Sequence, residues 1–222
     1  MEDVLEVYTR PYDPRFPQVC MDESAKQLLQ DKRESLPIQP GQPERVDYTF
    51  ESEGMRKIFL ACEPLTGQRQ VKVTERRTSQ DWAAFIRELV DVHYPQAEKI
   101  VLVMDNLNTH TPSSLYATFP PPEAHRILRK LEIHYTPVHG SWLNMAEIEL
   151  SALARQCLSR RIGTKAQLER EVYAWQQRRN EEATTVNWRF TTADARIKLK
   201  RLYPSLEPRK RISKKNHVAK EG

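Results

Sequence analysis

Two aspartates that are far apart in the sequence follow patterns that bring carboxylates together. Asp22 follows the apolar run Gln18–Met21, and Asp105 follows the apolar run Ile100–Met104. Both runs are typical of β-strands, and the carboxyl ends of parallel strands meet at one edge of a sheet. If the two strands are neighbours, the carboxylates need a positive charge between them, and oxygen ligands indicate Mg²⁺ or Mn²⁺. The alternative is that both are turn or capping residues, because Asp is common after strands.

A third carboxylate, Glu147, lies where a strand end leads into a helix. The segment Pro137–Glu149 places Glu147 in the first helical turn, pointing back toward the edge of the sheet. Asn144 and Glu147 also have the spacing of a capping box, which stabilises a helix without any catalysis. Both interpretations of Glu147, metal ligand and helix cap, therefore stay open. Glu149 faces another way and is the weaker candidate.

Polar and aromatic residues flank these carboxylates. Asn106, Asn108 and His110 follow the second aspartate in a loop, where amides and an imidazole can contact metal-bound water or a phosphate group. His110 can equally be an ordinary loop histidine. Trp142 can stack on an unpaired base or pack as a hydrophobic staple beside the helix start. Asn144 is a further candidate for supporting the site or contacting DNA.

The composition limits the class of protein. The chain has 222 residues, of which 39% are apolar, so it can bury a core and wholesale disorder is excluded. Its 3 cysteines are odd in number and far apart, which fits neither a disulfide scaffold nor a zinc cluster and indicates a reducing compartment. Ile100–Met104 is too short to span a bilayer, and residues 1–20 lack a basic leader with an apolar core. We therefore expect a soluble protein that is not exported.

Positive charge is concentrated at the C-terminal end. Residues 195–222 carry a net charge of +8, so the preceding part carries −3 of the total of +5. Such an arm usually binds polyanions, although a solvated tail that aids solubility fits the charge equally well. Pro204 and Pro208 mark a linker before the arm, which we expect to be flexible over residues 205–222. Its candidate polyanion-binding residues are Arg209, Lys210, Arg211, Lys214 and Lys215.

Hydrophobic periodicity predicts the elements that position these residues. An antiparallel meander followed by alternating strands and helices predicts an α/β fold with a mixed sheet and helices on both faces. Residues 24–56 are interpreted as a long insertion between the first two strands, with an edge strand near Val46–Phe50. Trp82, Phe85 and Trp175 are assigned to the core. The predicted strands are Gln18–Met21, Lys57–Cys62, Gln70–Thr74, Ile100–Met104 and Glu132–Thr136. The predicted helices run from a Thr78 cap to Val90, over Glu123–Leu131, from Leu143 to about Leu158 and from Lys165 to about Arg179.

Three segments, in this order along the chain, resemble a known family. Val101–His110 and His139–Glu147 resemble the second and third catalytic blocks of the mariner-type DDE transposases, and the match is closer to the bacterial branch named for insertion sequence 630. Val19–Glu23 is similar to the first block of that branch. The resemblance continues to Trp188–Thr192 and covers the chain up to about Pro204.

The resemblance implies a ribonuclease-H-like catalytic domain over residues 1–204, with a mixed five-stranded sheet. It implies that Asp22, Asp105 and Glu147 are the carboxylate triad. Our hypothesis is that the triad binds two Mg²⁺ or Mn²⁺ ions, which Asp22 would bridge, while Asp105 and Glu147 would each complete the shell of one. The activity would be divalent-metal-dependent DNA cleavage and strand transfer of an insertion sequence. The alternatives are a catalytically inactive or truncated remnant that only binds DNA, and a nuclease on the same fold.

The family also implies partners that the residues themselves do not show. These are the terminal inverted repeats, a target DNA with a TA site, and a second copy in a synaptic homodimer. The location would be the bacterial cytoplasm, with nucleoid association when DNA is bound. Related transposases carry N-terminal helix-turn-helix modules, and none is expected here before the first strand. We therefore expect an upstream frame joined by ribosomal frameshifting, or a truncated copy.

Overall fold

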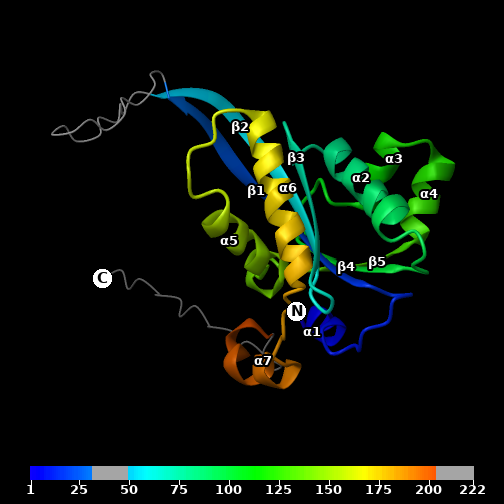
Figure 1. Ribbon diagram of the computed structural model, residues 1–222. Coiled ribbons are helices and arrows are strands. Elements are labelled where there is room, and N and C mark those ends of the chain that lie inside the picture. The colour runs from blue at the N-terminus through cyan, green and yellow to red at the C-terminus, as the bar shows by residue number, and fades with distance from the viewer. Residues whose placement is uncertain (32–49, 204–222) are drawn as a thin grey trace, which may run out of the picture. The chain divides into compact units, whose positions relative to one another are not determined.

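The computed structural model describes residues 1–31 and 50–203. The chain divides into two units between Arg189 and Phe190, and residues 190–203 of the second unit are described. The larger unit holds a five-stranded sheet and the helices that cover it (Figure 1). The smaller unit contains α7 (Thr192–Lys198) and the 3-10 helix η3 (Lys200–Leu202).

The sheet has the strand order β3-β2-β1-β4-β5. β1 pairs antiparallel with β2, and β2 with β3, whereas β4 pairs parallel with both β1 and β5. This is the mixed five-stranded sheet that the sequence predicted. The parallel pairing of β1 with β4 makes neighbours of the two strands that precede Asp22 and Asp105. The strands are β1 (Gln18–Asp31), β2 (Phe50–Glu63), β3 (Gln68–Thr74), β4 (Ile100–Met104) and β5 (Leu131–Tyr135).

β1 and β2 are longer than predicted, so the expected insertion over residues 24–56 is wrong at both of its ends. β1 continues to Asp31, and β2 begins at Phe50 and pairs with it along this extension. The first six residues of β2 are exposed, so the extension lacks the apolar alternation that reveals a half-buried strand. Backbone hydrogen bonds between the two strands hold it instead. The predicted edge strand at Val46–Phe50 lies outside the described residues except for its last position.

Three helices and a π-helical turn lie against one face of the sheet (Figure 1). α2 begins with the predicted capping box between Thr78 and Asp81. Trp82 and Phe85 of α2 are fully buried against Met21 and neighbouring strand residues, which confirms their assignment to the core. These elements are α2 (Ser79–Glu88), η1 (Leu89–His93), α3 (Pro112–Thr118) and α4 (Pro121–Arg129).

The other face of the sheet is covered by α5 and α6, which contact β1, β2 and β3. Leu168, Val172 and Trp175 of α6 are buried, so Trp175 also belongs to the core as predicted. A short helix that the sequence did not predict, α1, contacts β5. In the described part of the chain, no helix combines the length and apolarity needed to cross a membrane. The elements are α1 (Glu2–Val7), the 3-10 helix η2 (Ser141–Leu143), α5 (Ala146–Gln156) and α6 (Lys165–Glu182).

Candidate active site

The three predicted carboxylates come from the elements that the sequence suggested. Asp22 lies in β1, two residues beyond Cys20, where the parallel pairing of β1 with β4 ends. Asp105 directly follows β4, and Glu147 is in the first turn of α5. Asp22 is buried, Asp105 is half-buried and Glu147 is exposed. The site therefore opens to solvent on the side of Glu147.

Asp22 carries the electrostatic signature of the site. Burial, together with the negative charges of Asp105, Glu147 and Glu23, raises the pKa of its carboxyl to about 7, against the lowering effect of a hydrogen bond from the Glu23 backbone. That bond, from Glu23 N–H to Asp22 Oδ1, measures 2.7 Å. Asp22 is thus a buried acid whose charged neighbours repel its ionised form. The arrangement favours a cation close to Asp22.

Asn144 connects Asp22 to the start of α5. Its buried amide nitrogen donates to the carbonyl of Met21 at 2.8 Å and to Asp22 Oδ2 at 3.2 Å. Its amide oxygen accepts from the backbone N–H of Ala146 at 3.1 Å. One side chain therefore links β1 to the start of the helix that carries Glu147. The role of Asn144 in a site stays a prediction.

The alternative role of Glu147 in a capping box is wrong. The helix begins at Ala146, after the 3-10 turn η2, and its N-cap is Met145, which makes no side-chain capping bond. Glu147 is consequently the second residue of the helix, one position too early for a capping box. Since the N-cap is not Asn144, the Glu147 carboxylate is not engaged as a helix cap.

His110 bridges two carboxylates from different strands. Its Nδ1 lies 2.6 Å from Asp105 Oδ1, and its Nε2 lies 3.0 Å from Glu23 Oε2. Burial lowers the pKa of His110, but the hydrogen bonds and charges of Asp105 and Glu23 outweigh it and raise the pKa to about 9. At neutral pH the imidazolium donates from both nitrogens. The stacked ring of Trp82, 5.8 Å away between centroids, and the Tyr135 hydroxyl on the His110 carbonyl fix its place.

Glu23 and Arg77 are site residues that the sequence reasoning missed. Burial raises the pKa of Glu23, but His110 and Arg77 lower it below its usual value. Arg77 Nη1 lies 3.0 Å from Glu23 Oε1. Adjacent residues of a strand point to opposite faces, so Asp22 and Glu23 necessarily serve different neighbours. That alternation was the available signal for Glu23, whereas no local pattern marked Arg77.

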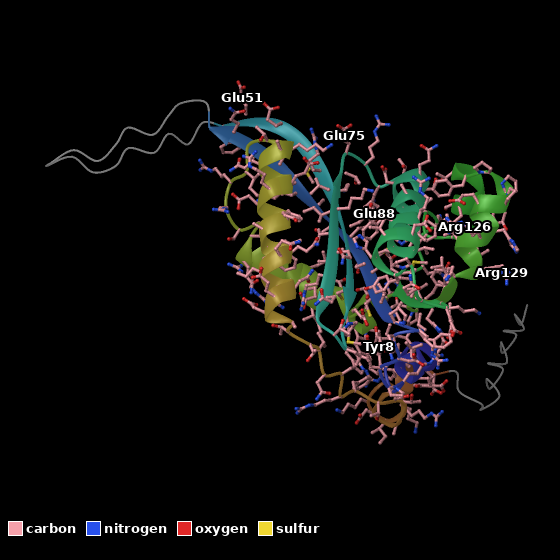
Figure 2. All side chains as sticks on the ribbon, turned by 45° about the vertical axis from the view of Figure 1, so that its right-hand side comes forward. Tyr8, Glu51, Glu75, Glu88, Arg126 and Arg129 are labelled. Atoms are coloured by element: carbon pink, nitrogen blue, oxygen red, sulfur yellow. The ribbon has the colours of Figure 1, made fainter. Side chains whose placement is uncertain are left out.

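Tyr8 supports the turn before α5 from the unpredicted N-terminal part of the chain. Its hydroxyl donates to the carbonyl of Leu143 at 2.7 Å, next to Asn144. Its ring packs at a tilt against Trp188, with centroids 5.2 Å apart. Burial raises the pKa of Tyr8, so the phenol stays protonated and keeps donating. Figure 2 labels Tyr8 near the lower end of the sheet.

Three further predicted residues are exposed, and their roles stay predictions. Asn106 and Asn108 are exposed in the loop after β4, and Trp142 is 45% exposed in η2. Glu149 is buried away from the cluster, as predicted, and pairs with Arg69 at 2.6 Å. The predicted basic arm lies outside the described residues, including Arg209, Lys210, Arg211, Lys214 and Lys215.

The chemistry of the donor set fits a hard divalent cation. Asp22, Asp105 and Glu147 offer only oxygen ligands, and the mutual repulsion at Asp22 is the type that Mg²⁺ or Mn²⁺ relieves. Across residues 1–31 and 50–203, no three His, Cys, Asp or Glu side chains are already spaced as ligands of one ion. The fit thus rests on ligand type and electrostatic coupling.

Comparison with known proteins identifies the family. Residues 17–169 match the family described as DDE superfamily endonuclease. The match covers more than half of the chain and includes Asp22, Asp105 and Glu147. The chain therefore belongs to the DDE superfamily endonuclease family. No curated protein matches the chain.

Solved structures with the same fold include three complexes of the mariner transposase Mos1. They are a paired-end complex with Mn, a paired-end complex with the left transposon end, and a strand transfer complex. Each has a TM-score of 0.53 and covers 82% of this chain, at 14%, 14% and 13% identity. This likeness confirms the ribonuclease-H-like fold. The chain spans 56%, 57% and 55% of the length of those chains.

Proposed function

We propose that this endonuclease-family chain is the catalytic part of a transposase that cleaves DNA and transfers the cut strand. The observation that carries the proposal is Asp22, a buried acid in the family segment whose pKa is raised to about 7 by burial and by neighbouring acids. Such a group needs a cation to work as a carboxylate near neutral pH. The sequence resemblance supports assignment to the bacterial branch named for insertion sequence 630.

Asp22, Asp105 and Glu147 would hold the metal, Mg²⁺ or Mn²⁺, and we infer two ions from the resemblance. When bound, such ions activate a water or a DNA 3′-hydroxyl and stabilise the departing oxygen of the phosphodiester. The protein positions these ligands. The Glu23 backbone N–H and Asn144 each bind one oxygen of Asp22, and His110 binds one oxygen of Asp105. Because each carboxylate oxygen has two lone pairs, a hydrogen-bonded oxygen can still coordinate a cation.

The charged residues that surround Asp105 support this arrangement. His110, with a pKa of about 9, stays protonated at neutral pH and thus orients the Asp105 carboxylate through a charge-assisted hydrogen bond. Glu23 accepts a hydrogen bond from Nε2 of the imidazolium, and Arg77 donates to the other carboxylate oxygen of Glu23. The chain Arg77–Glu23–His110–Asp105 is a second layer of alternating charge behind the proposed metal ligands. The carboxylates of Asp105 and Glu23 balance the positive charge of the buried His110 ring.

DNA is the proposed partner, both as the element end that is cut and as the target that receives it. The solved relatives are complexes with paired transposon ends or a strand transfer product, as their names state. For this chain we propose terminal inverted repeats, a TA target, a homodimer in the synaptic complex, and recognition modules supplied by an upstream frame. The basic arm over residues 205–222 would contact phosphates without sequence preference.

A nuclease that cuts without joining is the second candidate, because the family description itself names only an endonuclease. The two are separated by incubating the chain with Mn²⁺ and with either an intact element end or a pre-cleaved end plus target plasmid. Joined product from the pre-cleaved end supports the transposase. Nicking of the intact end with no joined product from the pre-cleaved one supports the nuclease, and neither product contradicts both.

A further inference from the structure

A hollow with an excess of positive charge lies at the edge of the sheet opposite the candidate active site. Its wall is formed by the residues just before β4 and by the last turns of α4 as it leads into β5. We call it the basic hollow. Its charged and titratable lining consists of Glu98, Lys99, His125, Arg126, Arg129 and Lys130. Four permanent cations thus face one acid, although the chain before residue 195 carries a net negative charge.

The cations of the basic hollow are not all compensated. The guanidinium of Arg126 donates two hydrogen bonds to Asp91 and two to Glu123, at 2.8–2.9 Å, and these four bonds hold its side chain in place. Lys99 and Arg129 are exposed, and within residues 1–31 and 50–203 neither side chain makes an ion pair. Figure 2 shows Arg126 and Arg129 on the same helix, α4. The hollow therefore presents at least two unpaired cations beside a third that is held rigidly.

The supporting helix is rigid. Ala124 and Ile127 of α4 are fully buried in the core beneath the hollow. The lining exposes little apolar surface, because its three large apolar side chains are partly buried (Phe16 and Leu128) or buried (Leu131). A rigid, open and cationic surface with little apolar area fits a row of phosphates better than an apolar protein partner.

We infer that the basic hollow binds the phosphate backbone of duplex DNA beyond the segment that is cut. The assignment to DNA rests on the proposed function, whereas the charge pattern is independent of it. β4 has five residues, so the hollow is separated from the carboxylate edge by roughly 17 Å, which a duplex crosses in about five base pairs. One duplex can therefore contact both edges of the sheet.

The test compares two variants that lose the same charge. Lys99→Ala/Arg129→Ala removes the unpaired cations of the basic hollow, and Arg170→Ala/Arg178→Ala removes two exposed cations from α6 as the control. Binding of a labelled duplex of about 30 base pairs is followed by fluorescence anisotropy in chelator over a series of salt concentrations. Thermal melting checks that both variants are folded.

We expect the hollow variant to bind more weakly and to flatten the slope of log K against log salt by about 2, while the control keeps the wild-type slope. An unchanged slope in the hollow variant, or an equal loss in the control, would overturn the inference. Equal loss of polyglutamate binding would also overturn it, because the hollow would then serve any polyanion. If wild type binds as expected but never cuts DNA, the proposed function fails and the basic hollow stands.

Discussion

Helix α5 contributes a carboxylate to each of two acidic clusters. In one cluster the negative charges are balanced by arginines, and in the other they are not. Glu147 faces the candidate active site, where Asp22 and Asp105 add negative charge. Two residues later, Glu149 is buried in a bidentate pair with Arg69, at 2.6 and 2.8 Å, and also contacts Arg179 at 3.2 Å. Burial raises the pKa of Glu149, but the hydrogen bonds and charges of Arg69 and Arg179 lower it below its usual value.

The contrast separates structural acids from acids that await a ligand. Arg69 also donates to the carbonyls of Gly67, Arg179 and Thr184, so the buried pair is fully satisfied within the protein. It joins β3, α5 and the end of α6. At the site, by comparison, His110 contacts Asp105 and Glu23, and Arg77 contacts Glu23. Within the part of the chain that the structure describes, neither cation forms an ion pair with Asp22. A cluster that the protein leaves uncompensated is the one expected to bind a cation.

The largest effect is expected from removing a proposed metal ligand. Asp105→Asn keeps the size of the side chain but removes its charge, so metal-dependent DNA cleavage should fall by a factor of roughly 10³ or more. The rate of nicking under single-turnover conditions measures this. Glu169→Gln on α6, which removes an equally exposed or more exposed acid, is the control and should cut normally. An Asp105→Asn protein that nicks at the wild-type rate removes this residue from the site.

The next largest effect is expected at the compensated cluster. Glu149→Ala leaves the Arg69 guanidinium buried without its partner, which should lower the free energy of unfolding by about 3–5 kcal/mol. Urea denaturation gives this value. The double variant Arg69→Met/Glu149→Leu removes both charges and should lose much less. A single variant as stable as wild type would show that the pair is not needed for stability.

Substitution of Asp22 is expected to raise the free energy of unfolding, whereas substitution of Glu149 lowers it. The raised pKa of Asp22 means that below about pH 4 the group is protonated in both folded and unfolded chains, and that stability falls as the pH rises toward 7 because only the unfolded chain ionises. Asp22→Asn should therefore be more stable than wild type in chelator at about pH 8, by a few kcal/mol, or roughly 2–4 °C in melting temperature for each kcal/mol.

A pH series of melting temperatures checks this sign. The difference between Asp22→Asn and wild type should vanish below about pH 4 and be complete above about pH 7. A melting temperature that the substitution lowers at every pH would mean that Asp22 is a structural acid like Glu149.

A smaller loss is expected from His110→Gln. The pKa of His110 is raised to about 9, so its stabilisation is full below its unfolded value of about 6.5 and is lost as the pH rises through 9. Near pH 7 the variant should lose about 1.5–3 kcal/mol of unfolding free energy, and less at higher pH. His125→Gln, on the exposed side of α4, is the control. A loss that does not depend on pH would contradict the charged role of His110.

The smallest effect is expected from Glu147→Gln in chelator. Glu147 is exposed and makes no capping bond, so its neutralisation should leave the melting temperature unchanged or slightly higher, by removing repulsion with Asp22. Differential scanning calorimetry measures this. A clear decrease would show that the negative charge of Glu147 stabilises the folded chain.

Local patterns predicted much of the fold. The hairpin of β2 and β3, the capping box at Thr78 and the buried strand β4 all follow from short-range spacing, and the structure confirms them. The extension of β2 was missed because its first six residues are exposed, and that of β1 because Leu28 alone is buried among residues 24–30. α1 was missed because six residues with two acids in the first turn give a weak signal.

The site was predictable where it depends on strand ends and not where it depends on long-range partners. The position of Asp105 directly after an apolar strand was enough to suggest its place. Glu23 meets His110 across 87 positions of sequence, and Arg69 meets Glu149 across 80. No spacing rule links such residues, because only the sheet and its helices bring them together.

The most direct measurement is a calorimetric titration of the full chain with Mn²⁺, compared with Asp22→Asn and with the control Glu169→Gln. The account predicts that wild type and the control bind Mn²⁺ and that Asp22→Asn loses this binding while remaining folded. Wild type that takes up no Mn²⁺, or an Asp22→Asn protein that binds it as wild type does, would contradict the claim that this acidic cluster is a metal site.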